Sequence, residues 1–288
     1  MEMKQLRIGT CSFKYPSWKG LIYSEDAHID YLREYSNHFD SVEIDRWFWS
    51  LFYPHGPVLP DPMVVQEYFD STPDDFTFSI KAPNSLSLTH YYRKDTGGAL
   101  EPNPHFYSLE LYERFLELIA PLENKIDSII FQFEYLNKQK MNGLAEFIDL
   151  TGEFFSKIPK PIPLALEIRN KNFLTPVYFD FLREQQICHT FVHGYWMPTM
   201  QDVYTRHGDR LGPKTVIRLM GEDRKGIEKL TGKKWNKIIL DKDGELRSIA
   251  GTIRSMLERN TFVTVNVNNH YQGSAPLTIE KLRTFLDG

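Results

Sequence analysis

Short apolar segments recur along the chain, and each is followed by a longer amphipathic one. The short segments are rich in Val, Ile and Phe, as buried parallel strands are, and predict strands at residues 6–10, 41–45, 76–81, 128–133, 164–169, 187–193, 215–219 and 262–268. The amphipathic segments repeat apolar residues every three or four positions and predict helices at residues 30–38, 61–70, 107–119, 141–156, 176–184, 245–259 and 278–286. Asp61 followed by Pro62 is a typical helix start.

Eight strands, most of them followed by a helix, predict an α/β fold, a TIM-like (β/α)8 barrel. The chain has 288 residues and no Ser/Gly-rich linker, so we expect a single domain over residues 1–288. A doubly wound open sheet is the alternative. That fold normally has a glycine-rich turn after its first strand, whereas the turn here is Gly9-Thr10-Cys11-Ser12-Phe13.

The composition excludes several classes of protein. Lys and Arg number 34 against 38 Asp and Glu, a net charge of −4, which argues against a general nucleic-acid coat but leaves a local basic patch open. Two cysteines, Cys11 and Cys188, form no disulfide or zinc framework, which indicates a reducing, cytoplasmic compartment. The first residues lack a signal-peptide layout, and no apolar run approaches the roughly 18 residues of a membrane span, so we expect no membrane partner.

Polar side chains share one face of most predicted strands. Successive strand residues point to opposite faces, so the apolar residues face the helices and the polar ones face the barrel axis. The axial positions are Glu43, Asp45, Thr77, Ser79, Lys81, Gln132, Glu134, Glu167, Arg169, Arg218, Thr264, Asn266 and Asn268. This is more charge than a packed core holds, so we expect a partly solvated pocket at the carboxyl ends of the strands, where this fold places active sites. The strands at residues 6–10 and 187–193 do not sort in this way.

Seven motifs in this order resemble those of one family, the domain of unknown function family 72, also called YecE-like. They are Val42-Glu43-Ile44, Phe76-Thr77-Phe78-Ser79-Ile80-Lys81-Ala82-Pro83, Thr89-His90, the strand with Gln132, Leu166-Glu167-Ile168-Arg169-Asn170, Val216-Ile217-Arg218-Leu219-Met220-Gly221 and Asn268-Asn269-His270-Tyr271-Gln272-Gly273-Ser274-Ala275. The resemblance runs from Ile8 to Leu282 and implies a TIM-like barrel but no established reaction. The family usually has an amide at position 45 and smaller residues after it. Asp45, Arg46 and Trp47 depart from that pattern and suggest a subgroup preference for the ligand.

Three carboxylates are the candidate catalytic residues: Glu43, Asp45 and Glu167. Crowding raises the pKa of at least one such group and prepares a proton donor or acceptor. Alternatively, they neutralise neighbouring cations. The candidate ligand-binding residues combine cations for an anionic group with amides and an imidazole for polar groups, and are Lys81, His90, Gln132, Arg169, Arg218, Asn266, Asn268 and Asn269. For the asparagines after the last strand, turn formation is the alternative.

Three histidines lie at or just after predicted strand ends: His90, His193 and His270. Together with the carboxylates they are residue types that hold divalent metals. No HxH or HExxH spacing supports such a site, and hydrogen bonding to loop backbone is the alternative, so we assign no metal ligands and name no cofactor. We expect Cys11 to be a small buried side chain rather than a nucleophile.

Three functions remain open. We favour an enzyme that binds a small polar, anionic ligand, phosphorylated or sugar-like, at the barrel mouth and uses carboxylates for acid/base chemistry. The second is a nucleic-acid-binding or metal-dependent phosphodiesterase-like barrel, with a phosphate track at residues 224–242, where seven basic residues and Trp235 accompany two acidic ones. The third is a non-catalytic binding or assembly module, whose interface is an aromatic cluster of Trp18, Trp47, Phe48, Trp49, Phe52 and Tyr53. Alternatively, these aromatic side chains stack on a sugar or base, or fill the space beneath long loops. The sequence decides neither whether the chain is an enzyme nor its oligomeric state.

Overall fold

The computed structural model describes residues 5–52, 54–92 and 100–288. Eight parallel strands form a closed barrel in which each strand pairs with its neighbours in the chain and β1 pairs with β8. The strands are β1 (Leu6–Thr10), β2 (Ser41–Ile44), β3 (Thr77–Lys81), β4 (Ile126–Gln132), β5 (Leu164–Glu167), β6 (Cys188–Gly194), β7 (Lys214–Gly221) and β8 (Phe262–Val267). The predicted TIM-like (β/α)8 barrel is therefore confirmed.

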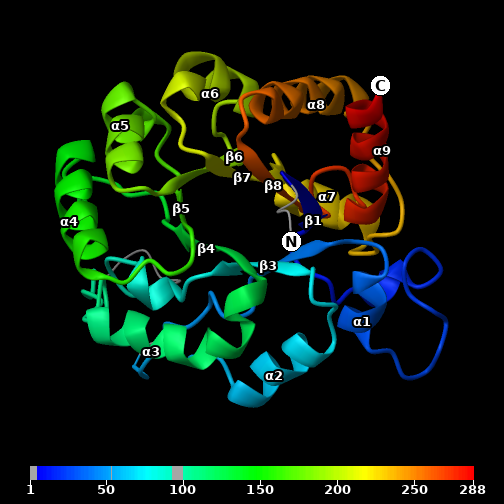
Figure 1. Cartoon of the computed structure of the whole chain (residues 1–288), viewed down its shortest axis with the longest axis horizontal. Coiled ribbons are helices and arrows are strands. Elements are labelled where there is room, and N and C mark those ends of the chain that lie inside the picture. Colours follow the sequence, from blue (N-terminus) through cyan, green and yellow to red (C-terminus); the bar gives the residue numbers. More distant parts are fainter. Residues whose placement is uncertain (1–4, 53, 93–99) are drawn as a thin grey trace.

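Helices form a ring outside the barrel (Figure 1). They are α1 (Tyr31–Ser36), α2 (Pro62–Asp70), α3 (Leu109–Ile119), α4 (Leu144–Lys157), α5 (Pro176–Glu184), α6 (Met200–His207), α7 (Arg224–Thr231), α8 (Asp243–Glu258) and α9 (Ala275–Asp287). Asp61 caps α2 as predicted, accepting a hydrogen bond of 2.9 Å from the Met63 amide. Helices α6 and α7 were not predicted from the sequence, because both are short and mostly polar. In α7, only Ile227 is buried.

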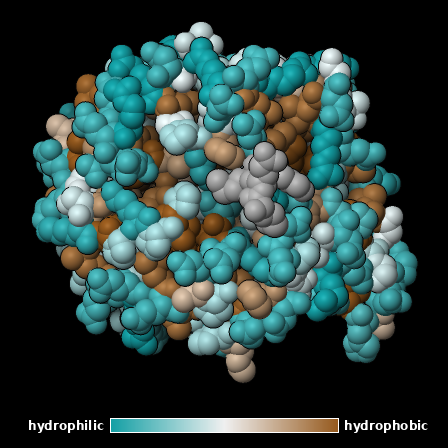
Figure 2. Space-filling model, viewed as in Figure 1, coloured by the Kyte–Doolittle hydropathy of each residue, from teal (hydrophilic) through white to brown (hydrophobic). Residues whose placement is uncertain are grey.

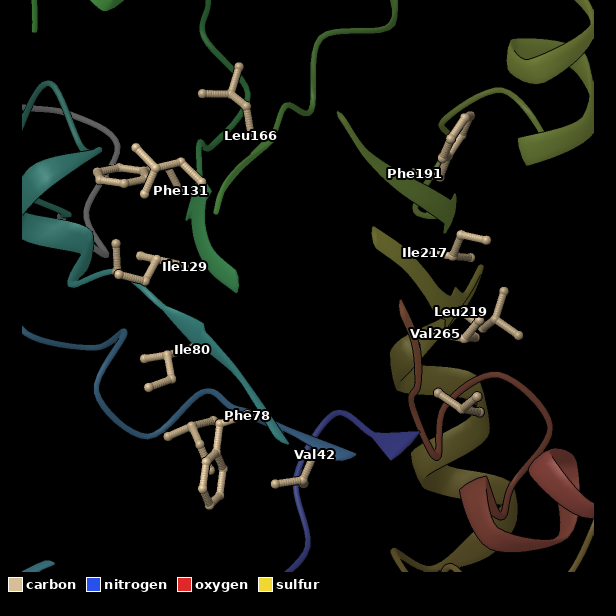
Figure 3. Close-up of a cluster of buried hydrophobic side chains, with 14 of the residues drawn as sticks. Val42, Phe78, Ile80, Ile129, Phe131, Leu166, Phe191, Ile217, Leu219 and Val265 are labelled. Carbon is tan, nitrogen blue, oxygen red and sulfur yellow. The ribbon is translucent and has the colours of Figure 1, made fainter. Parts of the chain in front are cut away.

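The main apolar core lies between the barrel and the helices. Figure 3 shows side chains such as Val42, Phe131 and Ile217 pointing from the strands towards this layer. Their neighbours along each strand point to the axis, where Ile130, Ala165, Cys188 and Val216 form a separate apolar layer inside the barrel. Gly9 permits the strands to close here, because a Cβ atom at this position would lie 1.9 Å from the carbonyl oxygen of Ser41.

Figures 1 and 2 look at the amino-terminal ends of the strands. The strands run clockwise in this view, which is the direction that right-handed crossovers give when seen from that end. Hydrophilic residues predominate at the edge of this face in Figure 2. At this end of the barrel, Lys214 lies 2.5 Å from Asp127, and the Thr264 hydroxyl donates to the same carboxylate at 2.8 Å. Polar contacts at this end of such barrels serve stability, so we look for function at the opposite end.

Several strands end earlier than predicted. Asp45, Arg169 and Asn268 lie just beyond β2, β5 and β8, in the loops at the barrel mouth. Glu134 lies two residues beyond β4 and contacts Lys140 at 2.6 Å instead of facing the axis. In the described part of the chain, no helix is both long and apolar enough to cross a membrane.

Candidate functional site

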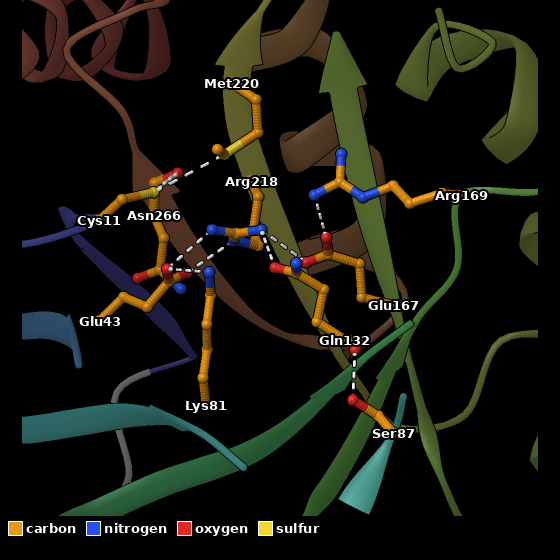
Figure 4. Close-up of polar contacts among 10 residues, drawn as sticks. All are labelled: Cys11, Glu43, Lys81, Ser87, Gln132, Glu167, Arg169, Arg218, Met220 and Asn266. Atoms are coloured by element: carbon orange, nitrogen blue, oxygen red, sulfur yellow. Dashed lines mark hydrogen bonds and ion pairs between the residues drawn. The ribbon is translucent and has the colours of Figure 1, made fainter. Parts of the chain in front are cut away.

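A charged cluster fills the barrel at the carboxyl ends of the strands, and Arg218 on β7 is its centre (Figure 4). Its Nε and Nη2 atoms donate to the two carboxylate oxygens of Glu43 on β2, at 2.6 and 2.8 Å. Its Nη1 atom donates to Glu167 on β5 at 2.7 Å and to the side-chain oxygen of Gln132 on β4 at 3.3 Å. Arg218, Glu43 and Glu167 are at most 1% exposed. Alternation along the strands therefore brings together side chains that lie up to 175 positions apart in the sequence.

Two further cations flank this centre. Lys81 on β3 places Nζ 3.5 Å from Glu43 Oε1 and 5.0 Å from the centroid of the Phe48 ring. Arg169 donates to Glu167 Oε1, and its guanidinium carbon lies 4.9 Å from the centroid of the Tyr195 ring. The cluster thus contains two carboxylates and three cations. Glu43 and Glu167 neutralise two of these charges, so the mouth carries one positive charge in excess unless Asp45 is ionised.

The environment holds Glu167 in its ionised form. Burial alone would raise the Glu167 pKa, but Arg169, Arg218 and Lys81 together lower it to about 2. The Arg218 pKa is correspondingly raised by Glu167 and Glu43 against the effect of burial. Glu167 therefore carries no proton to donate near neutral pH, and the neutralising role considered in the sequence analysis describes it better than the role of an acid.

Asp45 is the carboxyl group in this region whose pKa is raised. Burial raises it most and the charge of Glu43 adds to this, while Lys81 and Arg218 oppose the shift. Asp45 sits one residue beyond β2, half-buried, whereas Glu43 and Glu167 are fully buried. Among the three carboxylates selected from the sequence, Asp45 is thus the one that combines solvent access with a tendency to hold a proton.

Asn266 on β8 faces the interior of the barrel beside Cys11 (Figure 4). Both polar atoms of its amide, like the Ser79 hydroxyl on β3, are buried and have no hydrogen-bond partner among the described residues. Buried polar groups in folded proteins are normally satisfied by protein, water or ligand. These side chains therefore mark a polar part of the interior, next to the charged cluster. Burial raises the pKa of the Cys11 thiol, so this thiol is not an activated nucleophile.

Other predicted ligand-binding residues have local partners instead. The Asn268 side chain accepts from the His270 backbone amide at 2.9 Å. The side chain of Asn269 accepts from the amide of Ala275 at 2.8 Å. Both bonds shape the turn between β8 and α9, the alternative considered from the sequence. His90 contacts the Thr89 hydroxyl at 2.8 Å and has no contact with the charged cluster.

The three histidines considered as metal ligands do not converge. His193 pairs with Glu245 at 3.0 Å, and His270 pairs with Glu228 at 3.1 Å. Among the residues placed by the structure, no group of three or more His, Cys, Asp or Glu side chains has the arrangement to hold a metal ion.

Sequence reasoning missed Tyr195, whose ring lines the mouth against Arg169. Tyr195 and Trp196 both adopt left-handed backbone conformations, with φ of 51° and 59°. They follow Gly194, where a Cβ atom would lie 2.2 Å from the Gly221 carbonyl oxygen. A glycine at the end of a predicted strand, followed by two aromatic residues, was the available signal.

The proposed aromatic interface divides into two groups. Trp18, Trp47 and Phe48 are buried, so these three fill space beneath the loops, which is the alternative considered from the sequence. Trp49 and Phe52 are 60% and 49% exposed, and Tyr53 lies outside the described residues. Trp235, in the basic segment, is buried and accepts from Trp18 Nε1 through its carbonyl oxygen at 2.9 Å. Its ring is therefore not available to stack on a base.

A closed (β/α)8 barrel with a charged mouth defines the class of protein. The chain belongs to the DUF72 family, a protein family of unknown function whose model matches residues 7–288. The UPF0759 protein YunF of Bacillus subtilis (strain 168) is 26% identical over 219 residues, which cover 72% of this chain and 68% of YunF. The UPF0759 protein YecE of Escherichia coli (strain K12) is 28% identical over 149 residues, which cover 51% of this chain and 45% of YecE.

Two solved structures have the same fold. A DUF72 family protein from Enterococcus faecalis V583 matches with a TM-score of 0.68 at 20% identity, covering 98% of this chain and 96% of that chain. Another, from Thermotoga maritima MSB8, matches with a TM-score of 0.67 at 18% identity, covering 98% and 99%. These similarities establish fold and family. The family description gives no reaction.

Proposed function

We propose that this chain binds a small anionic ligand at the carboxyl-terminal mouth of the barrel and exchanges a proton with it. The observation that supports this most is the charge balance around Arg218, where two carboxylates accompany three cations. Arg218 is fully buried and donates to Glu43, Glu167 and Gln132, so in this proposal it orients the cluster and does not contact the ligand. Lys81 and Arg169 are the cations at the edge, with 8% and 16% of their side chains exposed.

The guanidinium of Arg169 is the main anchor for the ligand in this proposal. Its Nη2 atom donates to Glu167, and the contact with the Tyr195 ring fixes the plane of the guanidinium. A guanidinium held in this way presents its remaining N–H groups in the fork that suits phosphate or carboxylate oxygens. Lys81 contributes a second positive charge from the opposite side of Arg218.

Asp45 is the proton-exchanging residue in this proposal. Its pKa is raised by burial and by Glu43, and a bound anion would raise it further through repulsion. A protonated Asp45 gives the mouth its excess positive charge, so ligand binding and proton uptake favour each other. Glu43 and Glu167 position Arg218 and do not move protons.

Isothermal titration calorimetry with inorganic phosphate and glycerol 3-phosphate tests the binding step. Arg169→Gln should weaken binding by about tenfold or more, because it removes a charge-assisted hydrogen bond. Lys81→Gln should act in the same direction. Lys138→Gln is the matched control, since Lys138 is exposed in the loop after β4. Binding that these substitutions leave unchanged, or no binding of small oxyanions at all, would contradict the proposal.

A further inference from the structure

A cavity of about 660 Å³ lies outside the barrel mouth, between the loops that follow β1 and β2 and the helices α1 and α2. These two helices are neighbours in the outer ring (Figure 1). Its walls include Phe13, Lys14, Lys19, Tyr31, Arg46 and Tyr68. Cavities that hold small molecules commonly measure about 300–1,000 Å³, so this one has the size of a ligand site.

Three cations line the cavity, and none of them forms an ion pair within the part of the chain that the structure places. Lys14 Nζ lies 5.7 Å from the centroid of the Tyr31 ring. Lys19 Nζ donates to the Asp26 carbonyl oxygen at 2.8 Å. Arg46 is exposed and adjoins the Tyr68 hydroxyl. A ring, a carbonyl and a hydroxyl thus position the three cations while leaving their charges uncompensated.

Two carboxylates share the cavity wall with these cations: Asp30 and Glu67. Asp30 is engaged elsewhere, because it caps α1 through the Arg33 amide and contacts Arg33 Nε, both at 3.1 Å, and the Ser71 hydroxyl at 3.2 Å. Glu67 is the acid that opposes the three cations. The cavity therefore has a surplus of positive charge.

Two aromatic rings in the wall are held in place by other rings. Tyr31 packs edge-on against Tyr23, with centroids 5.0 Å apart. Tyr68 is buried and stacks on Trp47 and Phe78, with centroids 5.6 and 6.3 Å away, so Tyr31 is the ring of these two that a ligand can reach. Fixed rings beside cations suit a ligand that combines a planar ring with an anionic group, because stacking and charge pairing then act on two parts of one molecule.

We propose that this cavity is a second binding site, separate from the mouth, for an organic phosphate that carries a planar ring, of the size of a nucleoside diphosphate. Phosphate oxygens would contact Arg46 and Lys14, and the ring would pack on Tyr31, which is partly exposed.

Isothermal titration calorimetry with ADP tests this site, with inorganic pyrophosphate as the probe that lacks the ring. Arg46→Gln and Lys14→Gln should each weaken ADP binding by about tenfold. Glu67→Gln should strengthen it by about twofold, because it removes the opposing charge. Lys138→Gln should have no effect, and pyrophosphate should bind more weakly than ADP.

Arg169→Gln separates the two sites, and it should leave ADP affinity at the cavity unchanged. ADP binding that Arg169→Gln abolishes and Arg46→Gln spares would overturn the cavity site while supporting the mouth. Absence of ADP binding at millimolar concentration, or equal affinity for pyrophosphate and ADP, would also overturn the inference. If phosphate does not bind at the mouth but ADP still binds at the cavity, the proposed function is contradicted and the cavity site is still supported.

Discussion

Arg218 donates to both carboxylate oxygens of Glu43 across the barrel, from β7 to β2, at 2.6 and 2.8 Å. The pair is bidentate and fully buried, and a third side chain, Glu167, occupies the remaining edge of the guanidinium. The Arg218 guanidinium can stay charged in the interior because Glu43 and Glu167 both contact it there. The cluster therefore fixes the geometry of the mouth as well as its charge.

Removal of Arg218 should destabilise the protein strongly. Arg218→Met leaves Glu43 and Glu167 buried without their main partner, and we expect a loss of about 3–5 kcal/mol in the free energy of unfolding. Urea denaturation measures this. Arg183→Met is the control, because Arg183 pairs with Asp180 at the surface with 53% of its side chain exposed and should cost less than about 1 kcal/mol. Similar losses in both variants would show that the buried cluster is not special.

Glu167 should make stability depend on pH in the acid range. Its pKa falls from 4.5 to about 2 on folding, so its contribution is complete above pH 4.5 and is lost as the pH falls towards 2. That shift corresponds to about 3 kcal/mol. Urea denaturation between pH 5 and about 2 should therefore show a shallower loss in Glu167→Gln than in the wild type. Some loss should remain, because the Glu245 pKa is also lowered to about 2. Equal slopes in the two proteins would contradict the assignment.

Anion binding at the mouth should take up protons. Asp45 holds a proton more readily than a free carboxyl group, so affinity should be highest at low pH and fall as the pH rises through the raised Asp45 pKa. Calorimetry of phosphate binding in two buffers of different ionisation enthalpy measures the uptake. Asp45→Asn should abolish it and hold affinity near its low-pH value, about tenfold above the wild type at higher pH. Uptake that persists in Asp45→Asn would assign the proton to another group.

Truncation of two tryptophans in one loop should have very different effects on stability. Trp47 is 6% exposed and stacks on Tyr68, so Trp47→Ala should cost about 3–5 kcal/mol in unfolding free energy. Trp49 is 60% exposed, so Trp49→Ala should change stability by less than about 0.5 kcal/mol. Size-exclusion chromatography of Trp49→Ala also tests the assembly hypothesis, which requires a concentration-dependent oligomer that this substitution weakens.

The regular part of the fold was predictable, because side chains along a strand point to alternate faces of the sheet. Alternation placed Glu43, Lys81, Gln132, Glu167 and Arg218 on the axial face, and the structure brings these side chains together. The direction of a side chain was not predictable beyond the end of a strand, as at Asn268, because loop residues do not alternate between two faces. Helix α7 was missed for a related reason, since its single buried residue gives no apolar stripe.

The electrostatic roles were not predictable from the sequence. Crowded carboxylates suggested a raised pKa at the mouth, yet Glu167 has a lowered one, because two arginines contact it directly. The pKa values of Glu167 and Asp45 shift in opposite directions because different side chains surround the two carboxyl groups, and the sequence does not show which. Tyr195 was not predicted for a different reason. Its position beside Arg169 depends on a left-handed backbone conformation, which few residues other than glycine adopt.

A selenate soak tests the central claim most directly, because this oxyanion gives an anomalous signal that locates it in a crystal. We expect an anomalous peak at the mouth that places selenate oxygens within hydrogen-bond distance of the Arg169 guanidinium and of Lys81 Nζ, and loss of this peak in crystals of Arg169→Gln. Selenate bound elsewhere on the molecule with no peak at the mouth would contradict it.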